Sequence, residues 1–202
     1  MTRAATNRRM GPVGSANWQA MLDAAEATLR EEGYGALTSR RIAERVGVKQ
    51  RLVYYYFQTM EEVIVETWRG CASRELDRLH DMASRPRPLR ELWDLCIATH
   101  DSRLISEFMA LSNRSEGLRA EVIAFIEEAR AIQEEAIAAA LARTPGACDI
   151  APDGLALLAS SLALSVTREA ALGVDVGHGA VLALVEHFLA QVEPEAPGAN
   201  AP

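Results

Sequence analysis

The sequence has few cysteines, few aromatic residues and no long apolar run. Its three cysteines (Cys71, Cys96 and Cys148) are far apart and form no C-x-x-C pair, so neither a disulfide framework nor a zinc ribbon is predicted. The longest apolar runs, such as 137–142, are much shorter than the ~20 residues of a membrane-spanning helix. No apolar stretch follows the N-terminal arginines as in a secretory signal. We therefore expect a cytoplasmic protein with no membrane partner.

Motifs of catalysis are also missing. The sequence contains no G-x-S-x-G, H-E-x-x-H, P-loop or G-x-G-x-x-G pattern. Cys96 and His100 lie four residues apart and can share one face of a helix. Because no second pair of this kind accompanies them, packing explains them better than a metal site. We predict a protein that is not an enzyme and that has no cofactor and no metal.

Strand signals are nearly absent, whereas helical patterns fill most of the 202 residues. With 49% hydrophobic residues the chain can bury a core, as one domain or two small ones. Glycine and proline clusters separate the helical segments. The predicted helices are 15–32, 39–46, 49–57, 59–82, 88–100, 103–112, 118–141, 153–172 and 178–192. The predicted fold class is therefore all-α.

Charge is distributed unevenly along the chain. The whole sequence has a formal net charge of −7, which by itself disfavours a nucleic-acid partner. Residues 1–59, however, contain nine basic and five acidic side chains, and the remainder contains 12 basic and 23 acidic ones. A small basic N-terminal segment on a larger acidic body is typical of a nucleic-acid-binding segment.

Residues 37–57 have the pattern of a helix-turn-helix. Two short helices are joined at Gly47, which can adopt the positive φ that the turn needs, and Ala43 is small where the helices approach. On a helical wheel Val53 and Phe57 fall on the inner side of the second helix, which enters the DNA major groove in such motifs. The outward and flanking side chains suit bases and phosphates, and the predicted DNA-binding residues are Thr38, Arg40, Arg41, Lys49, Gln50, Arg51, Tyr54 and Tyr55.

Residues 18–66 resemble the DNA-binding domain of the TetR family of transcriptional regulators. The motifs that carry the resemblance are Leu22-Asp23-Ala24-Ala25, Gly33-Tyr34, Thr38, Ile42-Ala43, Gly47-Val48, Val53-Tyr54, Phe57 and Glu61-Glu62. The resemblance implies that Thr38, Tyr54 and Tyr55 contact phosphates and that the start of the second helix reads bases. The chain departs from the family pattern at Lys49, Arg51, Leu52 and Met60, which suggests an unusual operator.

The acidic remainder resembles that family only in layout, which implies a helical bundle that binds an effector and dimerises. Candidate effector-lining residues between the middle helices are Trp68, Trp93, Cys96, His100, Phe108, Met109, Ser112, Asn113 and Phe125, each of which can equally be plain core. The last two helices carry an apolar stripe suited to a homodimer (Leu155, Leu158, Leu162, Val166, Val181, Leu184, Val185, Phe188, Leu189 and Val192).

The expected organisation has four parts. These are a flexible basic arm (1–13), a three-helix helix-turn-helix DNA-binding domain (14–59), an all-helical effector-binding and dimerisation bundle (60–192) and a disordered tail (193–202). The resulting hypothesis is a regulator that binds a palindromic double-stranded operator as a homodimer. It would act as a repressor, released by a small hydrophobic effector. An activator of the same family and a helical adaptor without DNA binding remain the alternatives.

Overall fold

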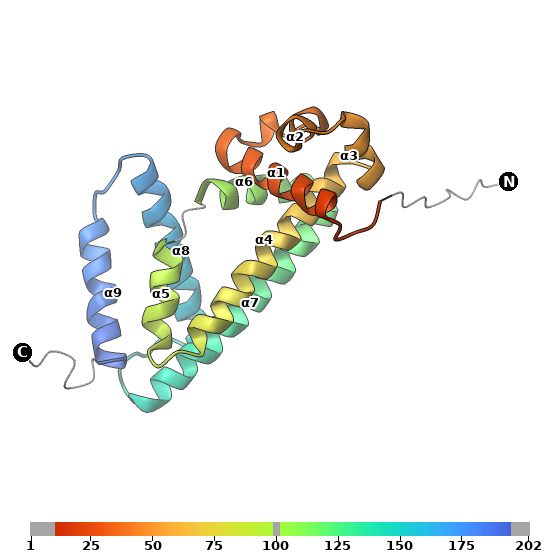
Figure 1. Cartoon of the computed structure of the whole chain (residues 1–202). Coiled ribbons are helices and arrows are strands. Elements are labelled where there is room, and N and C mark those ends of the chain that lie inside the picture. The colour runs from red at the N-terminus through yellow and green to blue at the C-terminus, as the bar shows by residue number, and fades with distance from the viewer. Residues whose placement is uncertain (1–10, 99–101, 195–202) are drawn as a thin grey trace, which may run out of the picture. The chain divides into compact units, whose positions relative to one another are not determined.

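A computed structural model of the chain describes residues 11–98 and 102–194, and within them every regular element is a helix (Figure 1). The elements are α1 (Ala16–Glu32), the 3-10 helix η1 (Tyr34–Ala36), α2 (Ser39–Val46), α3 (Gln50–Tyr56), α4 (Met60–Ala83), α5 (Pro88–Ala98), α6 (Ser102–Ser112), α7 (Glu116–Arg143), α8 (Pro152–Ala171) and α9 (His178–Val192). The all-α prediction is confirmed, and the sequence does not predict η1. Part of the predicted basic arm, most of the predicted tail and His100 lie outside the described residues.

Capping side chains explain where α2 and α4 begin. Thr38 Oγ1 accepts a hydrogen bond from the Arg41 N–H at 3.1 Å, and Thr59 Oγ1 accepts one from the Glu62 N–H at 3.1 Å. In a capping box the Glu62 carboxylate would accept a hydrogen bond from the Thr59 N–H, whereas here Glu62 Oε2 accepts one from the Gln58 N–H at 2.7 Å. Both helices therefore start where the sequence predicts.

The chain divides into two compact units, and α4 and α7 contribute to both. The first unit contains residues up to Ala72 together with 103–122. Its core is formed by one face of α1, by Ile42 and Ala43 on α2, and by Val53 and Phe57 at the end of α3. These side chains are the ones that the 3.6-residue period assigns to the inner faces.

The remaining elements of the first unit pack on each other through large side chains. Trp68 on α4 and Phe108 on α6 meet edge to face with ring centroids 5.0 Å apart. In Figure 1, α4 and α7 run alongside each other, and Arg69 on α4 donates to Glu121 on α7 at 2.6 Å. The long helix that leaves the helix-turn-helix is therefore fixed to its neighbours within this unit.

The second unit, 73–102 with 123 onward, has a separate core. Its buried side chains come from α4, α5, α7, α8 and α9: Leu79, Leu89, Leu92, Trp93, Ile132, Ala136, Ile137, Ala140, Ala156, Ala163, Leu189 and Val192. No helix among the described residues has the length and apolar character needed to cross a membrane.

Glu193 is predicted to be the first residue of a disordered tail, and this prediction is wrong. Its carboxylate is buried and accepts hydrogen bonds from the Leu89 N–H at 2.9 Å and the Arg90 N–H at 3.0 Å, at the start of α5. Arg90 in turn pairs through both guanidinium nitrogens with Glu186 on α9. The composition of the tail does not reveal this role, because the partner donors lie about a hundred residues earlier in the chain.

Candidate nucleic-acid interface and ligand cavity

The helix-turn-helix forms with the geometry that the sequence predicts. Gly47 has φ 75° and ψ 30°, in the left-handed region, and this bend lets α3 follow α2 across the turn. Val53 and Phe57 on the inner side of α3 are each 1% exposed and fix the helix in place. The opposite side of α3 is consequently turned to solvent.

The predicted DNA-binding residues lie together on this motif. Arg41 is half-buried, and the other seven are exposed: Thr38, Arg40, Lys49, Gln50, Arg51, Tyr54 and Tyr55. Five of them are on or next to α3, and Thr38, Arg40 and Arg41 are at the start of α2. The structure therefore brings the set to one surface.

Ion pairs neutralise most of the positive charge of the first unit outside α3. Arg40 pairs with Glu44 at 2.9 Å, and Glu32 accepts from both Arg41 and Arg45 at 2.7 Å. The hydrogen bond from Arg41, and then the one from Arg45, lowers the pKa of Glu32 below its ordinary value of 4.5. Four of the five acidic residues of the N-terminal segment, all except Asp23, are therefore engaged by arginines of α1 and α2.

Lys49 and Arg51 are different. Within the part of the chain that the structure describes, neither side chain makes a hydrogen bond or an ion pair, and both are exposed. Two unneutralised positive charges of the unit thus lie at the start of α3, where an anion meets them without first breaking an internal pair.

Ser39 is a residue of this surface that sequence reasoning missed. It is 4% exposed, its hydroxyl donates to the Tyr54 hydroxyl oxygen at 3.0 Å, and it accepts from Gln50 Nε2 at 2.8 Å. The proton of the Tyr54 hydroxyl consequently remains available to an outside acceptor. No local pattern predicts this link, since Ser39 lies eleven and fifteen residues before its partners.

The predicted effector-lining residues do not form one site. Trp68, Phe108 and Ser112 are buried in the first unit, where Met109 is half-buried and Asn113 is exposed. In the second unit Trp93 and Cys96 line a cavity, whereas half-buried Phe125 is not among its lining residues. His100 is outside the described residues. Helical spacing alone cannot distinguish a core residue from a residue in a cavity wall. This explains why the predicted effector-lining residues fall in two different units.

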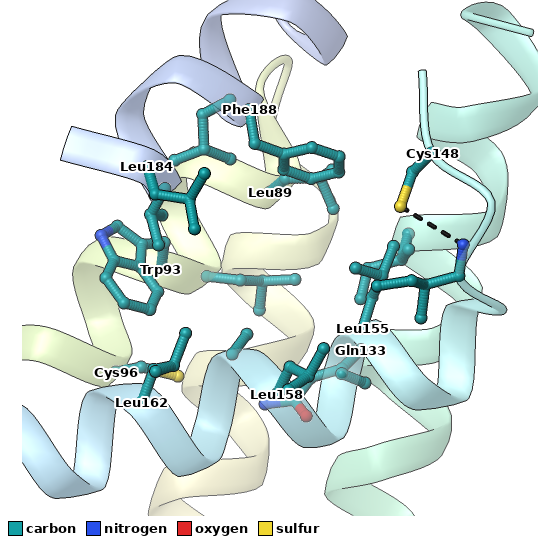
Figure 2. A pocket seen from close by; sticks show the side chains of 17 residues that line it. Leu89, Trp93, Cys96, Gln133, Cys148, Leu155, Leu158, Leu162, Leu184 and Phe188 are labelled. Atoms are coloured by element: carbon teal, nitrogen blue, oxygen red, sulfur yellow. Dashed lines mark hydrogen bonds between the residues drawn. The ribbon is translucent and has the colours of Figure 1, made fainter. Parts of the chain in front are cut away.

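The cavity in the second unit has a volume of about 280 Å³ and lies among α5, α7, the segment before α8, α8 and α9 (Figure 2). Its lining is almost entirely apolar. The polar groups on it are the Gln133 amide, the Trp93 indole, and the thiols of Cys96 and Cys148. Burial raises the pKa of the Cys96 thiol to about 11, so this group is uncharged at neutral pH.

The apolar stripe predicted for the dimer contributes much of the cavity wall. Leu155, Leu158 and Leu162 on α8 and Phe188 on α9 point into it (Figure 2), and Val185 on α9 also lines it. A stripe identifies the side of a helix that is covered but not the partner that covers it. Among the described residues, no three His, Cys, Asp or Glu side chains come together as metal ligands would.

Comparisons with known proteins agree with this architecture. The sequence model described as bacterial regulatory proteins, tetR family, matches residues 21–67. A curated relative, the fatty acid metabolism regulator protein of Bacillus subtilis (strain 168), is 24% identical over 87 residues. That match spans 43% of this chain and only 45% of the relative.

Solved structures match over a larger part of the chain. A transcriptional regulator of the TetR/AcrR family superposes with a TM-score of 0.74 at 19% identity, covering 86% of this chain and 98% of the other. AibR in complex with isovaleryl coenzyme A and operator DNA superposes with a TM-score of 0.62 at 16% identity, covering 75% and 86% of the two chains. At these identities the structures establish the fold: an N-terminal helix-turn-helix domain followed by a helical domain.

Proposed function

We propose that this chain is a ligand-responsive repressor of the tetR family of bacterial regulatory proteins, whose sequence model matches residues 21–67. The observation that carries this proposal is the pair of exposed, unpaired cations, Lys49 and Arg51, at the start of α3 of a helix-turn-helix. Regulators of this family are generally DNA-binding proteins without enzymatic activity. The proposed location is the cytoplasm, where the operator is accessible.

The proposed DNA interface uses α3 as the reading helix and α2 as its support. Lys49 contacts a phosphate, while Arg51 and Gln50 reach guanine and adenine edges in the major groove. Tyr54 donates its free hydroxyl proton to a phosphate oxygen, with Ser39 holding the ring in position. Thr38, Arg40, Arg41 and Tyr55 contact the backbone on either side.

The proposed functional parts are a DNA-binding domain at 14–59 and a ligand-binding and dimerisation domain at 60–192. A homodimer through α8 and α9 presents two α3 helices to two half-sites of a palindromic operator, about 34 Å apart or a multiple of that distance. Leu157, Leu164 and Leu184 support this contact because they remain exposed in the single chain.

A small hydrophobic molecule in the cavity among α5, α7, α8 and α9 is the proposed effector. AibR, a solved protein of similar fold, is in complex with both isovaleryl coenzyme A and operator DNA, which supports the proposal that a protein of this fold responds to a small molecule. Helix α4 continues from the first unit into the second. A shift of its second half on ligand binding would therefore move the helix-turn-helix. The two α3 helices of the dimer would then no longer fit into consecutive major grooves of the operator.

Selection of duplexes from fragmented genomic DNA at low ionic strength tests this function. We expect enrichment of fragments that share a palindromic site, and loss of binding when a hydrophobic effector is added. Arg51→Ala should weaken binding to that site by about 1–3 kcal/mol and relax the preference at one base pair. Failure to enrich any fragment would contradict the proposal.

A further inference from the structure

Three polar side chains form a chain of hydrogen bonds between α2 and α3. Gln50 Nε2 donates to Ser39 Oγ at 2.8 Å, and the Ser39 hydroxyl donates to the Tyr54 hydroxyl oxygen at 3.0 Å. Ser39 is 4% exposed, whereas Gln50 is exposed and Tyr54 is 50% exposed. Both ends of this chain are therefore open to an outside partner, while its centre is shielded from water.

The serine at the centre gives the chain of hydrogen bonds a direction. A hydroxyl group has one hydrogen to donate and two lone pairs with which to accept. Because the hydrogen of Ser39 is used by Tyr54, Ser39 can only accept from Gln50, and the nitrogen of the Gln50 amide must face it. Within the described part of the chain Gln50 Oε1 has no hydrogen-bond partner. The outer edge of the amide thus presents Oε1 as an acceptor and the second hydrogen of Nε2 as a donor.

The opposite direction would present a different amide edge. If the Tyr54 hydroxyl donated to Ser39, the Ser39 hydrogen would be free to bind Gln50 Oε1, and only the amide NH2 group would face outward. A phosphate bound at Tyr54 prevents this reversal, since the anionic oxygen takes the Tyr54 hydrogen and leaves Tyr54 as an acceptor toward Ser39. A contact at one end of the chain therefore fixes the amide orientation at the other end.

The orientation of the amide decides which purine it can pair with. In the major groove adenine presents the N7 acceptor and the N6 amino donor, which match an outward Oε1 and Nε2 hydrogen in a bidentate contact. Guanine presents two acceptors, O6 and N7, so Oε1 would face a lone pair there. An amide that is free to turn can instead direct its NH2 group at guanine. The preference for adenine over guanine consequently reports whether the amide is held.

We propose that Ser39 is a positioning residue for base recognition: with Tyr54 on a phosphate, the Ser39 hydroxyl holds the Gln50 amide in the orientation that accepts adenine and rejects guanine. The proposal rests on the proposed function, in which α3 reads the operator. It adds that the base preference at one operator position depends on Ser39 and Tyr54, neither of which contacts a base.

The test uses the full chain, the enriched operator duplex and versions of this duplex in which each base pair is replaced in turn. Fluorescence anisotropy at constant salt concentration measures the affinity for each duplex. Gln50→Ala identifies the base pair that Gln50 reads, because the preference of the wild type is lost at that position in each half-site. There we expect the wild type to bind adenine ~tenfold more tightly than guanine.

Two variants release the amide in different ways. Ser39→Ala removes the group that holds Nε2, and Tyr54→Phe keeps Ser39 but frees its hydrogen to bind Gln50 Oε1. Each should reduce the adenine preference at this position to about twofold and leave the preference at the position read by Arg51 unchanged.

Tyr55→Phe is the matched control. Tyr55 is the next residue on α3 and is 40% exposed, and its hydroxyl makes no hydrogen bond within the described ranges 11–98 and 102–194. Loss of this hydroxyl should lower the affinity for all duplexes by the same factor and leave the ~tenfold adenine preference intact.

Different outcomes identify which idea is wrong. A guanine preference at the Gln50 position, or an adenine preference that either Ser39→Ala or Tyr54→Phe retains in full, would overturn the inference. Loss of the preference in Tyr55→Phe, or no change of any preference in Gln50→Ala, would overturn it as well. In these cases the wild type still binds its operator and the proposed function stands. If Ser39→Ala does not fold, Tyr54→Phe decides alone. A wild type that binds no duplex contradicts the proposed function itself.

Discussion

At the scale of single residues, the contrast between paired and unpaired cations explains how an acidic chain can present a basic surface. Arg40, Arg41 and Arg45 are satisfied by glutamates of α1 and α2. Lys49 and Arg51 have no such partner among the described residues. The net charge of −7 therefore says little about the field at α3.

Lys49→Ala should weaken binding to all duplexes by a similar factor. Loss of one phosphate contact should reduce the slope of log K against log salt by about one unit. Fluorescence anisotropy across a salt series measures both effects. Arg78→Ala, an exposed cation on α4 paired with Glu75, is the control and should leave the slope unchanged. An unchanged slope for Lys49→Ala would mean that this residue does not contact the backbone.

Ser39 and Tyr54 should act as one unit in DNA binding. Ser39→Ala removes the support of the Tyr54 ring, and Tyr54→Phe removes the hydroxyl that the support positions. The double variant should therefore lose less affinity than the two single losses added together, by ~0.5–1.5 kcal/mol. Fluorescence anisotropy with an operator duplex measures the affinity of the wild type, the two single variants and the double variant, which together form a double-mutant cycle. Additive losses would show that the 3.0 Å hydrogen bond has no part in binding.

At the scale of helices, Glu32 connects α1 to α2 and makes the first unit sensitive to acid. Because its pKa is lowered in the folded state, its stabilisation is complete above the ordinary value of 4.5 and is lost as the pH falls through the folded-state pKa. Glu32→Gln should lower the urea midpoint at pH 7, and the difference from wild type should vanish in acid. Glu128→Gln, at an exposed position on α7, is the control. A difference that persists below the folded-state pKa would contradict the ion-pair explanation.

Glu193 stabilises the second unit by capping α5 from the end of α9. Glu193→Ala leaves the N–H groups of Leu89 and Arg90 without acceptors and should cost about 2 kcal/mol of unfolding free energy. Glu193→Gln, which keeps one acceptor oxygen, should cost less. Urea denaturation followed by circular dichroism measures the stability of the wild type and the two variants. Equal stability of Glu193→Ala and wild type would contradict the capping role of Glu193.

Local signals predicted the helices well because each depends on neighbours in sequence. Thr38 and Thr59 mark the starts of α2 and α4 because their side chains accept hydrogen bonds from N–H groups three residues later. Gly47 marks the end of α2 because its backbone adopts the left-handed conformation. The cavity could not be predicted in the same way. Trp68 and Trp93 look alike in a helical pattern, yet one is in the core of the first unit and the other lines the cavity of the second.

Longer-range links were missed for the same physical reason. Ser39 and Glu193 are ordinary polar residues in the sequence, and their roles depend on partners brought close only by packing. The apolar stripe on α8 and α9 is predicted as a dimer surface, but much of it lines the cavity within the protomer, and Leu158 and Leu184 remain exposed. Composition therefore defined the fold class, while tertiary packing assigned the partners.

At the scale of the whole molecule, one chain combines two kinds of surface. The first unit presents two exposed cations at the start of α3, and the second unit contains an apolar cavity. In the proposed function, a dimer through α8 and α9 would bind two half-sites at once, and ligand and operator would compete thermodynamically. DNA affinity, dimerisation and ligand binding should consequently change together.

Hydroxyl-radical footprinting of the enriched operator tests whether α3 reads the DNA, since it locates the protein on the duplex. We predict two protected segments on one face of the DNA, with centres a whole number of ~34 Å turns apart. The double variant Lys49→Ala/Arg51→Ala should give no footprint while keeping its helical content. A double variant that protects the same segments as the wild type would contradict the assignment of α3 as the DNA-reading helix.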